Sequence, residues 1–213
     1  MRSQKKTKQK YRLLLLFAAI LLALYGYDKY TRFHRLPPEM QQLQSAIGIP
    51  VTEQLIPIGN TGRPGIQREV KWVVIHETAN HTVGADARAH SKYILKHSVQ
   101  HALSWHYTVD DHEVYHHLPD NEVGWHAGDS LQKNGGNACG IGIEICVNDD
   151  GNFEKSLENA AKLSAFLLDH YHLSTSHLKQ HADFMDKNCP QTLRDSGRWE
   201  EFVQKVEKFR LNN

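Results

Sequence analysis

A histidine and a cysteine that could bind one metal ion lie eight positions apart in the segment Lys179–Pro190. Polar residues, two of them aspartate, separate His181 from Cys189, so we expect a loop there. Zinc binds imidazole nitrogen and thiolate sulfur in tetrahedral geometry, and a catalytic zinc needs only three protein ligands. His76 is the best candidate for the third ligand, because it follows the apolar run Trp72–Ile75, where a strand would deliver it to the rim of a sheet. These three residues together predict a zinc site.

Glu144 is the candidate for a general base, because it is a lone carboxylate between Ile143 and Ile145 in an apolar run. A carboxylate on the inner face of a sheet is costly unless it is paired, lies beside a metal or has a raised pKa. Zinc lowers the pKa of a bound water to about 7, and a neighbouring carboxylate can take the proton. The alternative is that this face of the strand is exposed to solvent.

Lys187 lies two residues before Cys189, inside the predicted metal loop. Its ammonium group could stabilise the oxyanion of a tetrahedral intermediate. The alternative is an ordinary solvated lysine, which is what most lysines are. The sequence alone leaves both interpretations open.

Histidine is abundant, with 15 residues in the chain, but one metal ion uses only two or three of them. The histidine count therefore does not identify a site. Glu77 would point to the opposite face of the strand from His76, so we do not expect it to be catalytic. We expect most of the other histidines to be solvated or locally hydrogen-bonded, namely His81, His90, His97, His101, His112, His116, His117, His170, His172 and His177.

The chain has three cysteines, and metal binding by Cys189 would explain the odd number in an exported protein. Cys139 and Cys146 are separated by an odd number of positions, so a continuous strand would point them to opposite faces. A disulfide between them is possible, but two free thiols are the better prediction.

The elements that must position these residues alternate between strands and helices, judged from apolar periodicity and turn residues. We expect strands over 70–75, 105–110, 113–118 and 140–147, and helices over 85–96, 157–171 and about 199–209. This order predicts an α/β fold in which a central mixed β-sheet is flanked by helices.

The first 27 residues differ from the rest of the chain. Residues 1–12 include six basic residues and no acidic one, and residues 13–27 carry no charge. We interpret them as a basic cytoplasmic tail and a single transmembrane helix that holds the catalytic domain outside the cell membrane. The apolar run is slightly short for a span, so a cleaved signal peptide and a buried core helix are alternatives. No small-x-small cleavage pattern follows it, and Tyr25, Tyr27 and Tyr30 suit a membrane interface.

Residues 28–67 are polar and rich in proline and glycine, which predicts a linker with a short helix around Glu39–Ser45. The catalytic domain would then occupy residues 68–213. The formal net charge is +1, which gives no electrostatic indication of nucleic-acid binding.

Several short segments, in this order, resemble the N-acetylmuramoyl-L-alanine amidase type 2 family, which includes phage and bacterial cell-wall amidases and the peptidoglycan recognition proteins. The resemblance covers residues 70–191, and each segment alone is weak. The segments are Val74–Thr78, Ser104–Tyr107, Gly124–Gly128, Ile141–Glu144 and His181–Pro190.

The resemblance implies that His76, His181 and Cys189 bind zinc. It implies that Glu144 is the catalytic glutamate and that Lys187 stabilises the transition state. Residues at the positions of Trp105, His106, Trp125 and His126 would contact or support the substrate. Phage relatives have a catalytic tyrosine at the position of Trp105, so the indole here removes that proton donor.

The function that the resemblance implies is hydrolysis of the amide between N-acetylmuramic acid and L-alanine in peptidoglycan, outside the membrane. One alternative is a recognition module that binds peptidoglycan without cutting it, although such relatives often lack a zinc ligand. Another alternative is a zinc hydrolase of the same fold that acts on a different amide. Stem-peptide preference and oligomeric state cannot be read from the sequence.

Overall fold

The computed structural model describes residues 16–17, 19–23 and 36–211, and residues 16–17 and 19–23 are helical. The predicted membrane anchor, residues 13–27, lies partly outside the described residues. Among the helices that the structure does describe, none has the length and apolar character needed to span a membrane. Residues from Pro38 onward form one compact unit, which carries the predicted metal ligands and catalytic residues.

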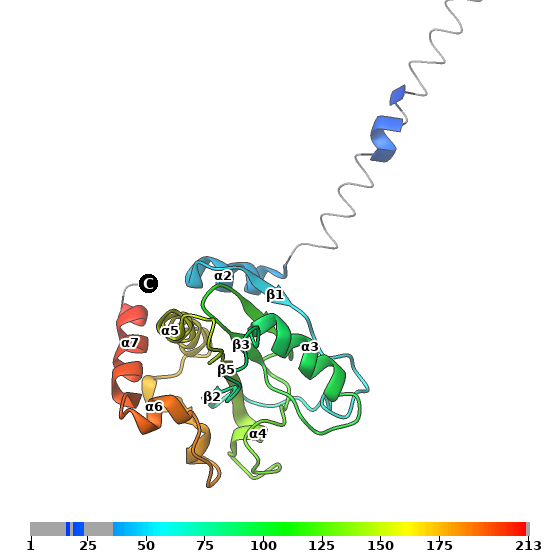
Figure 1. Ribbon diagram of the computed structural model, residues 1–213. Coiled ribbons are helices and arrows are strands. Elements are labelled where there is room, and N and C mark those ends of the chain that lie inside the picture. The colour runs from blue at the N-terminus through cyan, green and yellow to red at the C-terminus, as the bar shows by residue number, and fades with distance from the viewer. Residues whose placement is uncertain (1–15, 18, 24–35, 212–213) are drawn as a thin grey trace, which may run out of the picture. The chain divides into compact units, whose positions relative to one another are not determined.

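A six-stranded mixed sheet forms the centre of this unit (Figure 1). Its strands are β1 (Val51–Glu53), β2 (Trp72–Glu77), β3 (Tyr107–Val109), β4 (Val114–His116), β5 (Gly140–Ile145) and β6 (Leu178–Gln180). The spatial order is β1-β4-β3-β5-β2-β6, and only the β3–β4 pair is antiparallel. The predicted mixed sheet and its hairpin are confirmed.

Helices cover both faces of the sheet, as predicted. They are α2 (Pro38–Ile47), α3 (Ala87–His97), α4 (Gly136–Cys139), α5 (Phe153–His170), α6 (Gln191–Asp195) and α7 (Trp199–Leu211), with short 3-10 turns at Thr175–His177 and His181–Asp183. Helix α5 packs against β5, β2 and β3, and both α2 and α7 pack against α5. Helix α3 contacts β3 and β4 and lies on the other side of the sheet from α5 (Figure 1).

Side-chain caps fix where the two longest sheet-packing helices begin. The Asp86 carboxylate accepts a hydrogen bond from the Ala89 backbone N–H at 2.7 Å, which satisfies one of the unpaired donors of the first turn of α3. Asn152 does the same for Lys155 in α5 at 3.1 Å. Because helix starts are fixed by such caps, both helices begin within a few residues of the predicted positions.

The linker prediction is wrong from residue 38 onward, although the short helix expected around Glu39–Ser45 is confirmed as α2. Helix α2 buries Met40, Leu43 and Ile47, whose spacing of three and four positions forms one apolar stripe against α5. Strand β1 then pairs with β4 and extends the sheet by one strand. The proline-rich segment is thus folded into the domain, because Met40, Leu43, Ile47, Val51 and Ile56 are buried in the core.

Three neighbouring parallel strands, β5, β2 and β6, bring the predicted catalytic residues to one edge of the sheet. Glu144 and His76 are the next-to-last residues of β5 and β2 and are direct register partners. His181 follows the end of β6 immediately. Ligand sites of α/β proteins lie at the carboxyl ends of parallel strands, and this edge has that arrangement.

Candidate metal centre and active site

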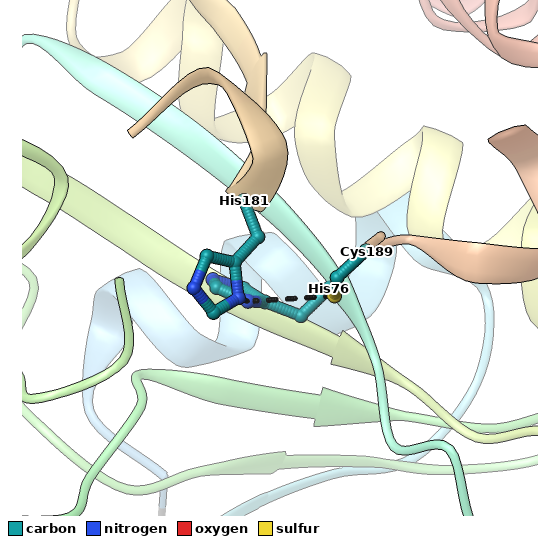
Figure 2. A group of neighbouring side chains, drawn as sticks. All are labelled: His76, His181 and Cys189. Carbon is teal, nitrogen blue, oxygen red and sulfur yellow. Dashed lines mark hydrogen bonds between the residues drawn. The ribbon is translucent and has the colours of Figure 1, made fainter. Parts of the chain in front are cut away.

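The side chains of His76, His181 and Cys189 converge from three different elements (Figure 2). One donor atom from each lies within 4.8 Å of the other two. The Nδ1 atoms of the two histidines are 3.0 Å apart, and the Cys189 sulfur is 3.9 Å from the His76 Nδ1. All three residues are buried. The structure therefore brings together the three residues that the sequence indicated as zinc ligands.

The donor set fits a tetrahedral zinc ion. With Zn–N of about 2.0 Å and Zn–S of about 2.3 Å, two imidazole nitrogens would be about 3.3 Å apart and a nitrogen and a sulfur about 3.6 Å apart. The observed 3.0 Å and 3.9 Å lie close to these values. Burial and the Glu144 carboxylate raise the pKa of the Cys189 thiol to about 12. A cation at this position would favour the thiolate and so complete the site.

Glu77 holds the loop that carries Cys189. Its carboxylate accepts hydrogen bonds from the backbone N–H groups of Thr192 and Leu193, at 2.8 and 3.2 Å. These are donors of the first turn of α6, which a negative charge stabilises. As predicted from strand alternation, Glu77 does not join the cluster formed by His76; it anchors α6 instead.

Glu144 lies beside the cluster, half-buried at the wall of a cavity. Burial raises the pKa of its carboxyl to about 8, although the Lys187 ammonium opposes this shift. Its Oε2 atom has no hydrogen-bond partner among the described residues. The other residues of β5 are buried, so Glu144 meets the cavity and not an open, solvent-exposed strand face. An unpartnered carboxylate oxygen of raised pKa suits a group that takes up and releases a proton.

A cavity of about 640 Å³ opens beside the cluster. Cys189, Glu144 and Lys187 line it, together with Trp105, which is 6% exposed. The Trp105 indole N–H donates to the Thr108 hydroxyl at 2.7 Å, so it is fixed as part of the cavity wall. The structure thus places both predicted catalytic residues and one predicted substrate contact around one cavity.

A family model for N-acetylmuramoyl-L-alanine amidase matches residues 66–192, and this range contains every residue of the cluster and also Glu144 and Lys187. The chain belongs to this family. Two amidases of Bacillus subtilis strain 168 are among its relatives. XlyA is 42% identical over 71% of this chain, and CwlH is 39% identical over 74%. The chain spans 49% of the length of XlyA and 61% of that of CwlH.

Two solved catalytic domains share the fold. The catalytic domain of XlyA superposes with a TM-score of 0.69, at 42% identity, covering 74% of this chain and 99% of that domain. The PlyG catalytic domain gives a TM-score of 0.67 at 25% identity, covering 76% of this chain and 96% of that domain. The superposed region covers almost the whole of each of these two solved domains.

Three of the predicted substrate contacts do not line the cavity of this amidase-family domain. His106 has no exposed surface: its Nδ1 accepts the Gly142 N–H, and its Nε2 lies 3.0 Å from the Glu122 carbonyl oxygen. His106 is therefore held behind the cavity and does not form part of its wall. Trp125 is half-buried and lies away from the cavity wall. His126 packs behind His76 instead.

The cavity also contains residues that the sequence did not single out. Ala89 and Tyr93, one helical turn apart on α3, form part of its wall, and Asn80 and Gln191 lie on it as well. Ala89 and Tyr93 are four positions apart, which places them on one face of a helix, but nothing in the sequence connects that face with the metal cluster. His90, expected to be a locally hydrogen-bonded residue, bonds the Asp86 carbonyl at 2.9 Å and also faces the cavity.

The cysteines other than Cys189 take no part in the amidase site. Cys139 and Cys146 are free thiols, and Cys146 is buried in a small cluster with Ala87 and Tyr115. Its sulfur lies 3.9 Å from the His90 Nδ1.

Proposed function

We propose that this protein is a zinc-dependent hydrolase that cleaves the amide bond between N-acetylmuramic acid and L-alanine in peptidoglycan. The observation that carries the proposal is the buried cluster of His76, His181 and Cys189 beside Glu144, at the wall of a cavity in an amidase-family domain. A module that only binds peptidoglycan has no need for a complete set of three metal ligands next to an unpartnered carboxylate.

Each residue has a separate role in the proposed reaction. Zinc held by the three ligands would supply a Lewis acid and a water of lowered pKa. Glu144 accepts a proton from the attacking water and passes it to the leaving nitrogen of L-alanine as the carbon–nitrogen bond breaks. The ammonium of Lys187 stabilises the negative charge that develops on the carbonyl oxygen. Trp105 excludes water from one side of the cavity, which strengthens these electrostatic effects.

The test uses the full-length protein, intact peptidoglycan and a zinc chelator. We expect new L-alanine amino termini to appear, to be lost with chelator and to return when zinc is added. If the protein sediments with peptidoglycan and contains zinc, but releases no amino group, the recognition-module alternative replaces this proposal. Release from soluble muropeptides without release from the polymer would instead indicate a different amide substrate.

We also propose that residues 13–27 anchor the protein in the cell membrane, with the catalytic domain on the extracytoplasmic side. The support is the uncharged apolar run after six basic residues, which favours an inside position for the N-terminus. Membrane fractions from cells that express the full chain should retain the protein after alkaline extraction. Recovery of a shorter, soluble form with a new N-terminus would show that the segment is a cleaved signal peptide.

A further inference from the structure

His126 forms a continuous chain of hydrogen bonds with the candidate metal ligand His76. The His126 Nε2 lies 3.1 Å from the carbonyl oxygen of Gly140. Its other nitrogen, Nδ1, lies 3.0 Å from the His76 Nε2. The remaining nitrogen of His76, Nδ1, faces His181 and Cys189 at 3.0 and 3.9 Å. Both imidazoles are buried, with exposed fractions of 8% for His126 and 1% for His76.

These contacts fix the position of each ring proton. A carbonyl oxygen can only accept, so the His126 Nε2 must carry a proton. Burial disfavours a charged ring, so the neutral His126 has its lone pair on Nδ1. That lone pair accepts from His76, whose proton must then be on Nε2. The His76 Nδ1 is therefore left as a lone pair that faces the other two donors, which is the form required of a metal ligand.

We infer that His126 is a positioning residue, which holds His76 in the tautomer and orientation that bind zinc through Nδ1. The inference rests on the proposed zinc site and concerns the second layer of residues behind it. Partners of this kind orient ligands, and their loss typically weakens metal affinity about 10- to 100-fold.

Packing around the His126 ring supports a specific role. A Cβ atom at Gly142 would lie only 2.8–2.9 Å from three atoms of this ring, and one at Gly124 would lie 3.1 Å from its Cδ2. The imidazole thus fills the space that a Cβ atom at position 124 or 142 would need, and only glycine lacks this atom. The backbone N–H of His126 donates to the Asn137 side-chain oxygen at 2.7 Å, and that of Ala127 does the same. Ring and backbone are therefore both fixed.

The test compares two amide substitutions of the same type. In His126→Asn the amide oxygen can occupy the position of Nδ1 and still accept from His76. In His126→Gln the amide group reaches toward Gly140, and His76 loses its acceptor. Zinc affinity of the full chain is measured by competition with a chromophoric chelator. The tautomer of His76 in the metal-free protein is measured separately by long-range ¹H–¹⁵N NMR, so neither readout depends on peptidoglycan hydrolysis.

We expect His126→Gln to bind zinc about 10- to 100-fold more weakly than the natural protein. We expect His126→Asn to stay within a few-fold of it. The His76 proton should be on Nε2 in the natural protein and in His126→Asn, and should appear on Nδ1 in His126→Gln. Equal losses in both variants, or an unchanged His76 tautomer in His126→Gln, would overturn the inference, because the histidine would then serve only as packing.

Gly142→Ala gives a second test that changes no polar group. The added methyl group should push the His126 ring away and weaken zinc binding in the same direction. His116→Asn is the matched control, because His116 is also a buried histidine of the sheet but does not contact the cluster. Unchanged zinc affinity in Gly142→Ala, in a protein with a native spectrum, would contradict the inference.

Discussion

Glu144 experiences two opposite influences on its pKa at the active site. Burial favours the neutral acid, whereas the positive charge of Lys187 favours the carboxylate, and the result is a pKa of about 8. A bound zinc ion would add a further positive charge and lower that pKa toward neutral. A carboxyl group with a pKa in this region can both accept and return a proton near pH 7, as amide hydrolysis requires.

Replacing Glu144 with glutamine should keep the shape of the cavity but remove the proton acceptor. We expect Glu144→Gln to lower the rate of amino-terminus release at least about 100-fold, within the range of general-base contributions. Zinc content, measured by chelator titration, should be unchanged, because Glu144 is not one of the three clustered donors. A Glu144→Gln protein that has lost its zinc would instead identify Glu144 as a structural part of the metal site.

Residue types were enough to find the three donors, because histidine and cysteine have a specific chemistry as metal ligands. Residue types alone did not distinguish the histidines that could bind the metal from the histidines that pack behind them. His106 and His126 are histidines in the same recognisable segments as the cavity residues, yet both are buried behind them. Which way a side chain points depends on tertiary packing, such as the space left by Gly142, and no pattern in one sequence reports it.

At the scale of elements, the carboxylate of Glu77 accepts hydrogen bonds from the first turn of α6 and so fixes where this helix begins. Because two backbone N–H groups donate to this buried carboxylate, Glu77→Ala should destabilise the fold by about 2 kcal/mol. It should also weaken zinc binding, since the loop with Cys189 leads directly into α6. Urea unfolding and chelator titration check both effects. Glu77→Gln, which keeps one acceptor oxygen, is the matched control and should show a smaller loss of stability.

Strand β1 is attached to β4 by a pair of charged residues as well as by backbone pairing. Glu53 and His116 are register partners, and their side chains approach to 3.6 Å; Asp120 lies 3.4 Å from the other ring nitrogen. Burial would lower the pKa of His116, but the two carboxylates outweigh it and raise the pKa to about 9. His116 is therefore charged in the folded protein at neutral pH.

This raised pKa predicts how stability depends on pH. Between the unfolded pKa of 6.5 and the folded value of about 9, the folded state binds more protons than the unfolded state. The stabilisation by charged His116 is complete below pH 6.5 and is lost as the pH rises to about 9, by at most about 3.4 kcal/mol at about 1.36 kcal/mol per pH unit. Urea unfolding at pH 6 and pH 9 measures it. His116→Asn should remove most of this difference, and an equal difference in that variant would contradict the assignment.

At the scale of the whole molecule, the folded domain begins at Pro38, well before Val74–Thr78, the first segment that resembles the amidase family. Helix α2 buries three large apolar side chains, each worth about 1.5–3 kcal/mol, which together rival the 5–15 kcal/mol that stabilises a typical domain. A chain shortened to residues 68–213 should therefore unfold at much lower urea concentration than residues 38–213. Equal midpoints for the two chains would mean that α2 and β1 are dispensable.

The fold class and the longer elements followed from the sequence because apolar periodicity determines which faces of strands and helices are buried. Strand β2 and helix α5, for example, lie close to their predicted ranges. The short strands β3 and β4 also lie within their predicted ranges, but β1 was not predicted. Strand β1 has three residues, and its pairing with β4, more than sixty positions away, has no local signal. Proline and glycine around it indicated a linker, although the buried residues of α2 form a helical stripe.

The wide separation of the metal donors along the chain has one further consequence. The contact between His76 and His181 joins residues 105 positions apart, so a bound zinc ion would act as a reversible cross-link across half of the protein. Closing a loop of this length removes unfolded-state entropy worth about 4.7 kcal/mol in the chain-entropy description of a disulfide. Chelation should then make the segment after β6 more sensitive to proteases, measurable by limited proteolysis. The availability of zinc would then affect how long the folded protein survives as well as the proposed hydrolysis.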